Sequence, residues 1–227
     1  MESIQKNVSI EIMESTNESI LEGIKNHTKI TQVVSDFISN GNGGGAIGGI
    51  KISGNASTNK EAWDKAYKEY GDRLGLRDER AYMHLLGQIM HESGSFKYME
   101  ELASGDAYEG RKDLGNTQPG DGRRFKGRGP IQVTGRANYK MIYDKFFKPN
   151  GLAQYDIVKN PELGSNPYVG SLLTFGWLLC TNNGKRAIKA CNSYDILSAT
   201  KAINGGTNGL KDRQNKTAAL LLENNLA

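Results

Sequence analysis

The sequence predicts a mainly α-helical protein. Beyond residue 58, apolar residues recur at helical spacing in several segments, and residues that cap helices stand at the starts of these segments. The sequence contains no long alternating pattern typical of β-strands. Its 227 residues suffice to bury a core without a metal or a disulfide framework. We therefore expect one folded domain with an appendage.

Two helices are expected in the first part of this domain. Thr58 and Glu61 form the pattern of a capping box, and the helix that they open should stop at Gly71. Asp78 is a suitable cap for a second helix, which should end near Glu92. The second helix therefore delivers a carboxyl group at its C-terminal end.

Four further helices are expected in the C-terminal half. Apolar spacing predicts the first between residues 139 and 146. Asn166 followed by proline predicts a helix over 169–179. Ser193 is a possible cap for a helix over 194–203, and Gly209 precedes a final helix that reaches Leu222. Residues 93–136 are Gly-rich, polar and too long for a plain connector, so we expect function there.

Charge and composition divide the chain into three parts. Residues 1–40 hold six acidic residues and three lysines, which gives them a net charge of −3. Because the whole chain carries +4, the remaining residues carry a net charge of +7. A patchy helical stripe predicts an N-terminal helical appendage over 1–40, whose role the sequence does not identify. A Gly-rich linker is expected over 41–57, followed by the main folded domain over 58–227.

The apolar runs, the net charge and the cysteine content exclude several classes of protein. No apolar run approaches the length of a membrane span, so no stable membrane insertion is expected. The N-terminus has no uninterrupted apolar core and does not resemble a signal peptide. A charge of +4 suits an anionic polymer but falls short of a nucleic-acid signature. Cys180 and Cys191 are expected to be buried thiols rather than a bridge.

Two carboxylates flank the start of the long irregular segment. Glu92 lies at a helix C-terminus, where the helix dipole disfavours negative charge, and a general acid needs a protonated carboxyl group. Glu101 follows nine residues later, beside Glu100. Glycoside hydrolysis uses two carboxyl groups, one to protonate the leaving oxygen and one to activate water or attack the sugar. Spacing alone does not choose between Glu100 and Glu101.

A Gly-rich run over 127–136 supplies neutral polar groups. Its glycines allow close approach of the backbone to a ligand. The alternation of Ile131, Gln132, Val133 and Thr134 predicts that Gln132 and Thr134 share one face. The Thr134 hydroxyl group is then a candidate to hold an attacking water.

Several separated motifs occur together in one order. They are His91-Glu92-Ser93-Gly94, Glu101-Leu102-Ala103-Ser104-Gly105, Ala107-Tyr108-Glu109-Gly110-Arg111, Leu114-Gly115-Asn116, Pro119-Gly120-Asp121-Gly122, the run from Gly127 to Tyr139, and Ile203-Asn204-Gly205-Gly206-Thr207-Asn208-Gly209-Leu210 with Arg213. Over residues 58–227 this series resembles the family 19 glycoside hydrolases, in particular the chitinase-like phage endolysins.

The resemblance implies a lysozyme-like, two-lobed helical fold with a deep substrate cleft. It implies inverting hydrolysis of β-1,4 bonds next to N-acetylated amino sugars, without a metal or organic cofactor. By motif position, Glu92 is the general acid and Glu101 the general base, and Thr134 orients the nucleophilic water. The remaining motif positions imply substrate-binding roles, with Arg213 also expected to pair with cleft carboxylates: Gln132, Asn138, Tyr139, Asn204 and Arg213.

Peptidoglycan is the favoured substrate. The sequence lacks the secretion signal, the disulfide framework and the Cys-rich module of secreted plant-type chitinases, and its loops are short, as in the phage enzymes. The expected cut lies between N-acetylmuramic acid and N-acetylglucosamine and lyses the cell wall. We expect a monomer made in the host cytoplasm, which acts after holin-dependent release or virion delivery. The alternatives are a chitinase, a lytic transglycosylase and a non-catalytic sugar-binding module.

Overall fold

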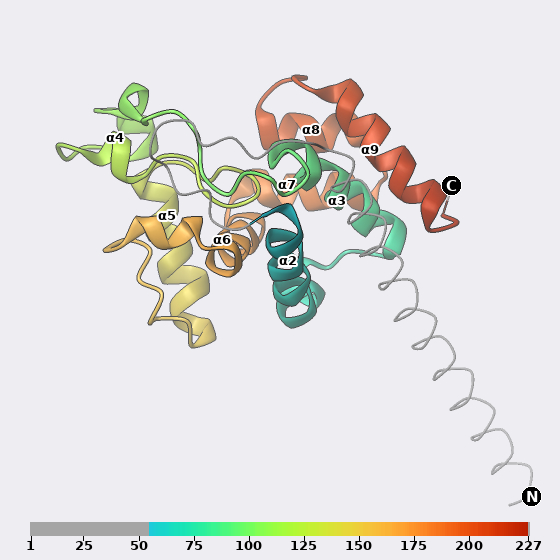
Figure 1. Ribbon diagram of the computed structural model, residues 1–227, viewed down its shortest axis with the longest axis horizontal. Helices are drawn as coiled ribbons and strands as arrows, with labels where there is room; N and C mark the ends of the chain where they lie inside the picture. The colour runs from blue at the N-terminus through green and yellow to red at the C-terminus, as the bar shows by residue number, and fades with distance from the viewer. Residues whose placement is uncertain (1–54, 227) are drawn as a thin grey trace, which may run out of the picture.

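A computed structural model describes residues 55–226 of the chain (Figure 1). The predicted helical appendage over 1–40 and almost all of the predicted linker lie outside the described residues. The α-helices are α2 (Ala56–Tyr70), α3 (Glu79–Glu92), α4 (Asp121–Arg124), α5 (Arg136–Ile142), α6 (Pro167–Cys180), α7 (Asn182–Asn192), α8 (Ile196–Asn204) and α9 (Leu210–Glu223). Within residues 55–226 there is no β-strand, only two isolated bridges. The mainly helical prediction is confirmed.

Short turns of other helical types join these helices. Four-residue and shorter 3₁₀ turns are η1 (Gly71–Leu74), η2 (Asp106–Tyr108), η3 (Lys112–Leu114) and η5 (Lys148–Asn150), and η6 (Pro161–Ser165) is a longer one. The segment η4 (Tyr143–Phe147) is a π-helical turn that extends α5. None of the described helices is both long enough and apolar enough to cross a membrane.

The first helix begins two residues before the predicted boundary at residue 58. Asn55 is its cap, because the Asn55 side chain accepts a hydrogen bond from the Thr58 N–H at 2.9 Å. The Asn55 N–H donates in return to the Thr58 hydroxyl oxygen at 3.0 Å. The capping box therefore joins Asn55 to Thr58, not Thr58 to Glu61. The predicted stop at Gly71 is confirmed, because α2 ends at Tyr70 with Gly71 as its C-cap, and the chain then continues through η1 to Gly75, where φ is 62°.

The second helix follows its prediction closely. The Asp78 carboxylate caps α3 by accepting from the Ala81 N–H at 2.8 Å. Helix α3 ends at Glu92, and Ser93 follows as the C-cap. The Ser93 hydroxyl group donates to the Ile89 carbonyl oxygen at 2.8 Å and accepts from the Phe96 N–H at 2.8 Å. These bonds fix the direction in which the chain leaves the helix after Glu92.

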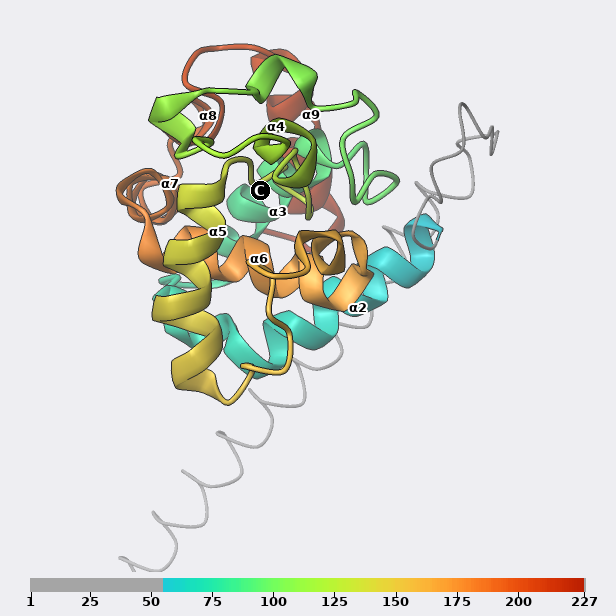
Figure 2. The same ribbon diagram turned by 90° about the vertical axis from the view of Figure 1, so that its left-hand side faces the viewer.

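Helix α6 forms the centre of the core. It packs against α2, α5 and α7, and Figures 1 and 2 show it running through the middle of the molecule. Most of its residues are buried, as expected for a helix that is apolar on every side. The ring of Phe175 lies 4.9 Å from that of Trp63, and the Trp63 ring lies 6.2 Å from that of Phe96. This cluster ties the segment just after Glu92 to α2 and α6.

The structure differs from the prediction at two helices of the C-terminal part, α7 and α8. Helix α7 was not predicted, and Ser193 is its C-cap rather than the N-cap of the next helix. Asp195 caps α8 instead, accepting from the Ser198 N–H at 2.9 Å. Helix α9 begins after Gly209 as predicted and packs against α3. Cys180 and Cys191 are free thiols.

The segment between α3 and α5 is irregular, as predicted. In Figure 1 it crosses from α3 towards α4 and α5, which lie on the other side of α6. Isolated antiparallel bridges join Glu100 to Arg128 and Arg128 to Val133. The alternation predicted for residues 131–134 is wrong, because Gln132 adopts a left-handed backbone with φ of 57° inside a tight turn. The turn still brings Gln132 and Thr134 together, through a hydrogen bond described below.

Candidate functional site

Glu92 is held at the end of α3 by Arg213 from α9. The Arg213 guanidinium group forms an ion pair with Glu92 Oε1 and donates to it through Nη2. The Arg213 side chain is fully buried, whereas 17% of the Glu92 side chain is exposed. The buried cation therefore fixes one carboxylate oxygen from behind and leaves the other side of the carboxyl group open to solvent.

A buried network holds Arg213 in turn. Its Nη1 donates to Gln88 Oε1 at 2.8 Å, and its Nε donates to the Asn208 carbonyl oxygen at 3.3 Å. Gln88 precedes Glu92 by one helical turn, so both side chains lie on one face of α3. Gln88 Nε2 also donates to Thr200 Oγ1 of α8 at 3.3 Å. Three helices thus converge on Glu92.

The ion pair changes the electrostatics expected from the sequence. The end of a helix disfavours negative charge, but a buried guanidinium group favours it. The expected pairing of Arg213 with a carboxylate is present, while its predicted contact with substrate is wrong, because Arg213 is 0% exposed. Its place is behind Glu92.

The loop between α8 and α9 lies beside Glu92. Asn204 ends α8 and is exposed, and the loop that follows it reaches Gly209, where φ is 69°. Gly209 packs against the ring of His91, the residue before Glu92: a Cβ atom at Gly209 would lie 2.1 Å from His91 Nε2. His91 Nδ1 contacts Asp212 Oδ2 at 2.6 Å. The exposed Asn204 therefore stands where α8 meets a loop that is anchored next to the predicted acid.

Substituting Gly209 with alanine is expected to lower both stability and activity. Its positive φ costs an L-residue about 1–2 kcal/mol, and the new methyl group would displace the His91 ring next to Glu92. Gly205→Ala is the matched control, since φ there is 81° but nothing lies within 4 Å of a Cβ atom. Thermal unfolding and turnover should show a loss in Gly209→Ala beyond that of Gly205→Ala. Equal losses in both variants would mean that the His91 contact has no role.

Glu101 is held by two neutral donors. The Tyr108 hydroxyl group donates to Glu101 Oε1 at 2.9 Å, and the Gly127 N–H donates to Oε2 at 3.1 Å. The Glu101 N–H donates to the Gly127 carbonyl oxygen at 2.9 Å, so backbone and side chain are both tied to the 127–129 segment. Burial and the bond to Glu101 raise the pKa of Tyr108, which keeps its hydroxyl group a donor. No ion pair with Glu101 occurs within residues 55–226.

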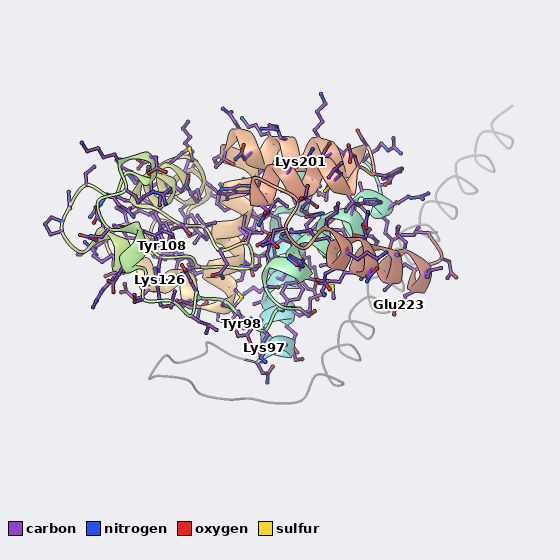
Figure 3. All side chains as sticks on the ribbon, turned by 90° about the horizontal axis from the view of Figure 1, so that it is seen from above. Lys97, Tyr98, Tyr108, Lys126, Lys201 and Glu223 are labelled. Carbon is purple, nitrogen blue, oxygen red and sulfur yellow. The ribbon has the colours of Figure 1, made fainter. Side chains whose placement is uncertain are left out.

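Glu100 has a different environment, which distinguishes the two neighbouring acids. Its oxygens face Lys126 Nζ at 2.6 Å and Arg128 Nε at 3.4 Å, and the Ser165 hydroxyl group donates to it as well. Lys126 also donates to the Glu101 carbonyl oxygen at 3.0 Å. Figure 3 shows Lys126 and Tyr108 on the same side of the molecule. Glu100 is therefore a structural residue beneath the loop that carries Glu101.

Replacing Glu100 with glutamine is expected to destabilise the fold by about 2–4 kcal/mol, because Lys126 and Arg128 are left buried without their counter-charge. Burial alone would raise the pKa of Glu100, but the bonds from Lys126 and Ser165 and the charge of Arg128 lower it overall. A lowered pKa contributes stability that is present above the unfolded value, about 4.3, and is lost as pH falls through the folded value.

The free energy of unfolding, measured by denaturant titration at several pH values, checks this expectation. The difference in the free energy of unfolding between the wild-type protein and Glu100→Gln should be largest above about pH 5 and should become smaller below about pH 4. A gap that stays constant with pH would show that the Glu100 charge does not stabilise the fold.

Gln132 lies close to Glu101, and Thr134 follows it two residues later. A Cβ atom at Gly127 would lie 2.9 Å from Gln132 Oε1 and 3.3 Å from Glu101 Oε2, so both side chains converge on that glycine. The Thr134 hydroxyl group donates to the Gln132 carbonyl oxygen at 2.9 Å. Its lone pairs are then left to accept a hydrogen bond from a water. The structure thus brings the Gln132 side chain next to Glu101 and ties Thr134 to the backbone of Gln132.

The last two predicted residues of this motif differ from one another. Asn138 is half-buried, and its Nδ2 donates to the Thr134 carbonyl oxygen at 2.8 Å, which supports the turn that carries Thr134. Tyr139 is 0% exposed and packs edge-on against Phe125. Its predicted contact with substrate is therefore wrong, and its hydroxyl group instead donates to the Lys126 carbonyl oxygen at 3.2 Å.

The site consists of two groups of residues. In the first, Glu92 is backed by the cation of Arg213; in the second, Glu101 accepts hydrogen bonds from two neutral donors, the Tyr108 hydroxyl group and the Gly127 N–H. One carboxyl group can donate a proton and the other can accept one from water. Sequence reasoning assigned no role to Gln88 or Tyr108, although Gln88 stands one helical turn before Glu92. Within residues 55–226, no group of three or more His, Cys, Asp or Glu side chains could hold a metal ion.

Comparison with known proteins points to one family. The chain is 30% identical over 147 residues to an endochitinase of Arabidopsis thaliana, a match that covers 65% of the chain and 47% of that protein. It is 27% identical over 125 residues to a glycosyl hydrolase family 19 domain-containing protein of Haemophilus influenzae, with 55% of each covered. The chain therefore spans about half the length of these curated relatives. No protein-family model matches it.

A solved structure shares the fold. Chitinase C from Streptomyces griseus superposes with a TM-score of 0.55 at 20% identity, covering 80% of this chain and 79% of that one. The likeness shows a common helical architecture.

Proposed function

We propose that this chain is a family 19 glycoside hydrolase and that it cleaves β-1,4 glycosidic bonds of bacterial peptidoglycan by inversion. The observation that carries the proposal is the pair of carboxyl groups held in different environments. Glu92 rests against a buried cation, and Glu101 against neutral donors. Glycoside hydrolysis uses two carboxyl groups, one as the acid and one as the base, and the motif positions assign these roles to Glu92 and Glu101.

In this mechanism Glu92 protonates the glycosidic oxygen of the leaving sugar. Glu101 accepts a proton from a water that attacks the anomeric carbon from the opposite face of the ring. The Tyr108 hydroxyl group and the Gly127 N–H hold the Glu101 carboxylate in place, so it loses little freedom when it binds the water. Thr134 accepts the second hydrogen bond of that water. Inversion requires about 6.5–9.5 Å between the two carboxyl groups, which leaves room for the water.

The proposed substrate is the bond between N-acetylmuramic acid and N-acetylglucosamine. Peptidoglycan carries carboxylate groups, and the sequence outside residues 1–40 carries a net charge of +7. Opposite charge raises the local concentration of a polymer substrate and favours its association. Cleavage of these bonds lyses the cell wall, which is the biological role that we propose.

Digestion of purified peptidoglycan and of chitin tests the proposal. We expect new reducing ends from peptidoglycan, with product masses equal to hydrolysis products and with the α-anomer formed first. Products lighter by one water would instead identify a lytic transglycosylase. Cleavage of chitin alone would assign the activity to a chitinase, and binding without cleavage of either polymer would identify a non-catalytic sugar-binding module.

A further inference from the structure

A basic hollow of about 410 Å³ lies between α5 and the chain that returns beside it. In Figure 2 the chain descends along the yellow column of α5, turns at its lower end and comes back towards α6. The hollow is lined by Arg124, Arg136, Lys140, Tyr143, Asp144, Lys148, Asp156, Val158 and Lys159. Five cationic side chains thus face two carboxylates.

The two carboxylates do not neutralise the hollow. Asp144 is shared between Lys140 at 2.6 Å and Lys148 at 2.7 Å. Asp156 accepts from the backbone N–H groups of Val158 and Lys159, at 3.1 Å and 2.9 Å. Within residues 55–226, neither Arg124 nor Lys159 forms an ion pair. Arg136 is paired with Asp121, so the five cations of the walls meet three carboxylates in all and a net charge of +2 remains.

The hollow adjoins the group of residues around Glu101. Arg136 begins α5 two residues after Thr134, and Arg124 lies three residues before Gly127, so their Cα atoms are within about 7 and 11 Å of these site residues. The two guanidinium groups lie against one ring, Phe125, at 4.6 Å and 5.4 Å from its centroid. A substrate strand held at Glu101 would place its side groups near these cations.

We propose that this hollow binds the carboxylate groups of the peptide stems on peptidoglycan. The inference rests on the proposed function and deepens it, because the glycan backbone of chitin is neutral whereas stem peptides carry free carboxylates close to the cleaved bond. Arginine and lysine bind carboxylates through charge-assisted hydrogen bonds. A group attached to the cleaved strand suits a hollow beside the site better than a separate polymer such as teichoic acid.

The test variant is Lys140→Gln with Lys159→Gln. Both side chains are exposed, and Asp144 keeps Lys148 as its partner, so the fold should be unchanged. Lys185→Gln with Lys189→Gln is the matched control. It removes the same two charges from exposed positions of α7, which lines a different hollow. Comparing the two double variants separates a local contact from the effect of net charge.

Initial rates should be measured on peptidoglycan freed of teichoic acid, before and after its peptides are removed by an amidase. We expect the Lys140/Lys159 variant to raise KM on the peptide-bearing polymer about 3–10-fold with kcat unchanged. On the stripped polymer, both variants should match the wild-type chain. Equal effects of the two double variants, or an equal rise on the stripped polymer, would overturn the inference. A rise in KM that appears only when teichoic acid is left on the polymer would also overturn the inference.

A binding experiment separates this inference from the proposed function. The isotope-labelled full chain is titrated with the free tetrapeptide stem and with its fully amidated form, and amide resonances are followed by NMR. Shifts near Arg136 and Lys159 are expected with the acidic peptide only, and the Lys140/Lys159 variant should lose them. A chain that binds this peptide but cleaves no peptidoglycan would refute the proposed function alone. A chain that cleaves peptidoglycan without these shifts would refute the hollow alone.

Discussion

Replacing Glu92 with glutamine is expected to lower kcat on peptidoglycan by roughly 10²–10⁴-fold. The amide cannot protonate the leaving oxygen, so the departing sugar must leave as an alkoxide. Glutamine can still accept a hydrogen bond from Arg213, which keeps its bonds to Gln88 and Asn208. Arg213 loses its counter-charge, and because Glu92 is partly exposed we expect a stability cost of about 1–3 kcal/mol. The folded structure should survive.

The leaving group supplies a sharper test of this role. The phenol of an activated aryl glycoside is acidic enough to leave as its anion without being protonated. Glu92→Gln should therefore retain far more activity on that substrate than on the natural polymer. Glu162→Gln, a change at an exposed glutamate outside the site, controls for the loss of one negative charge. Circular dichroism checks that each variant is folded. An equal loss on both substrates would show that Glu92 is not the acid.

The helices that the sequence predicted best are those with an explicit cap. Asp78 and Asn166 begin α3 and α6 as expected, because each side chain satisfies backbone N–H groups within its own first turn. Helix α7 was missed because its start, Thr181, follows directly on α6 with no intervening loop. The run from Thr181 to Arg186 is polar and contains a glycine, so it has the composition of a loop although it forms the cap and first turn of α7.

Local spacing also cannot reveal which side chains meet across the fold. Glu100 and Glu101 are adjacent and chemically identical, and only the placement of Lys126 and Arg128 shows that the first is structural. Tyr139 belongs to a motif of polar site residues yet is fully buried, because α5 turns that side of the motif towards Phe125. Arg213 lies far from Glu92 along the chain, and the pair depends on the packing of α9 against α3.

Glu101→Gln is the second substitution with a large expected effect, a fall in kcat of roughly 10²–10⁴-fold. The glutamine can occupy the same place without an unsatisfied donor. Its carbonyl oxygen accepts from the Gly127 N–H, and its amide group donates to the Tyr108 hydroxyl oxygen, which can reverse its role. The loop should therefore keep its shape, and the loss should appear in kcat rather than in the free energy of unfolding.

Rescue by azide distinguishes a base from a residue that merely shapes the site. Azide attacks a sugar without losing a proton, so it needs no base, and the smaller Glu101→Ala variant leaves room for it. We expect azide to restore turnover in Glu101→Ala and to yield an α-glycosyl azide, the inverted product. It should not restore turnover in Glu92→Ala on the natural polymer, because the leaving group still lacks its acid. A β-glycosyl azide from Glu101→Ala would instead indicate a double displacement, and it would contradict the inverting mechanism.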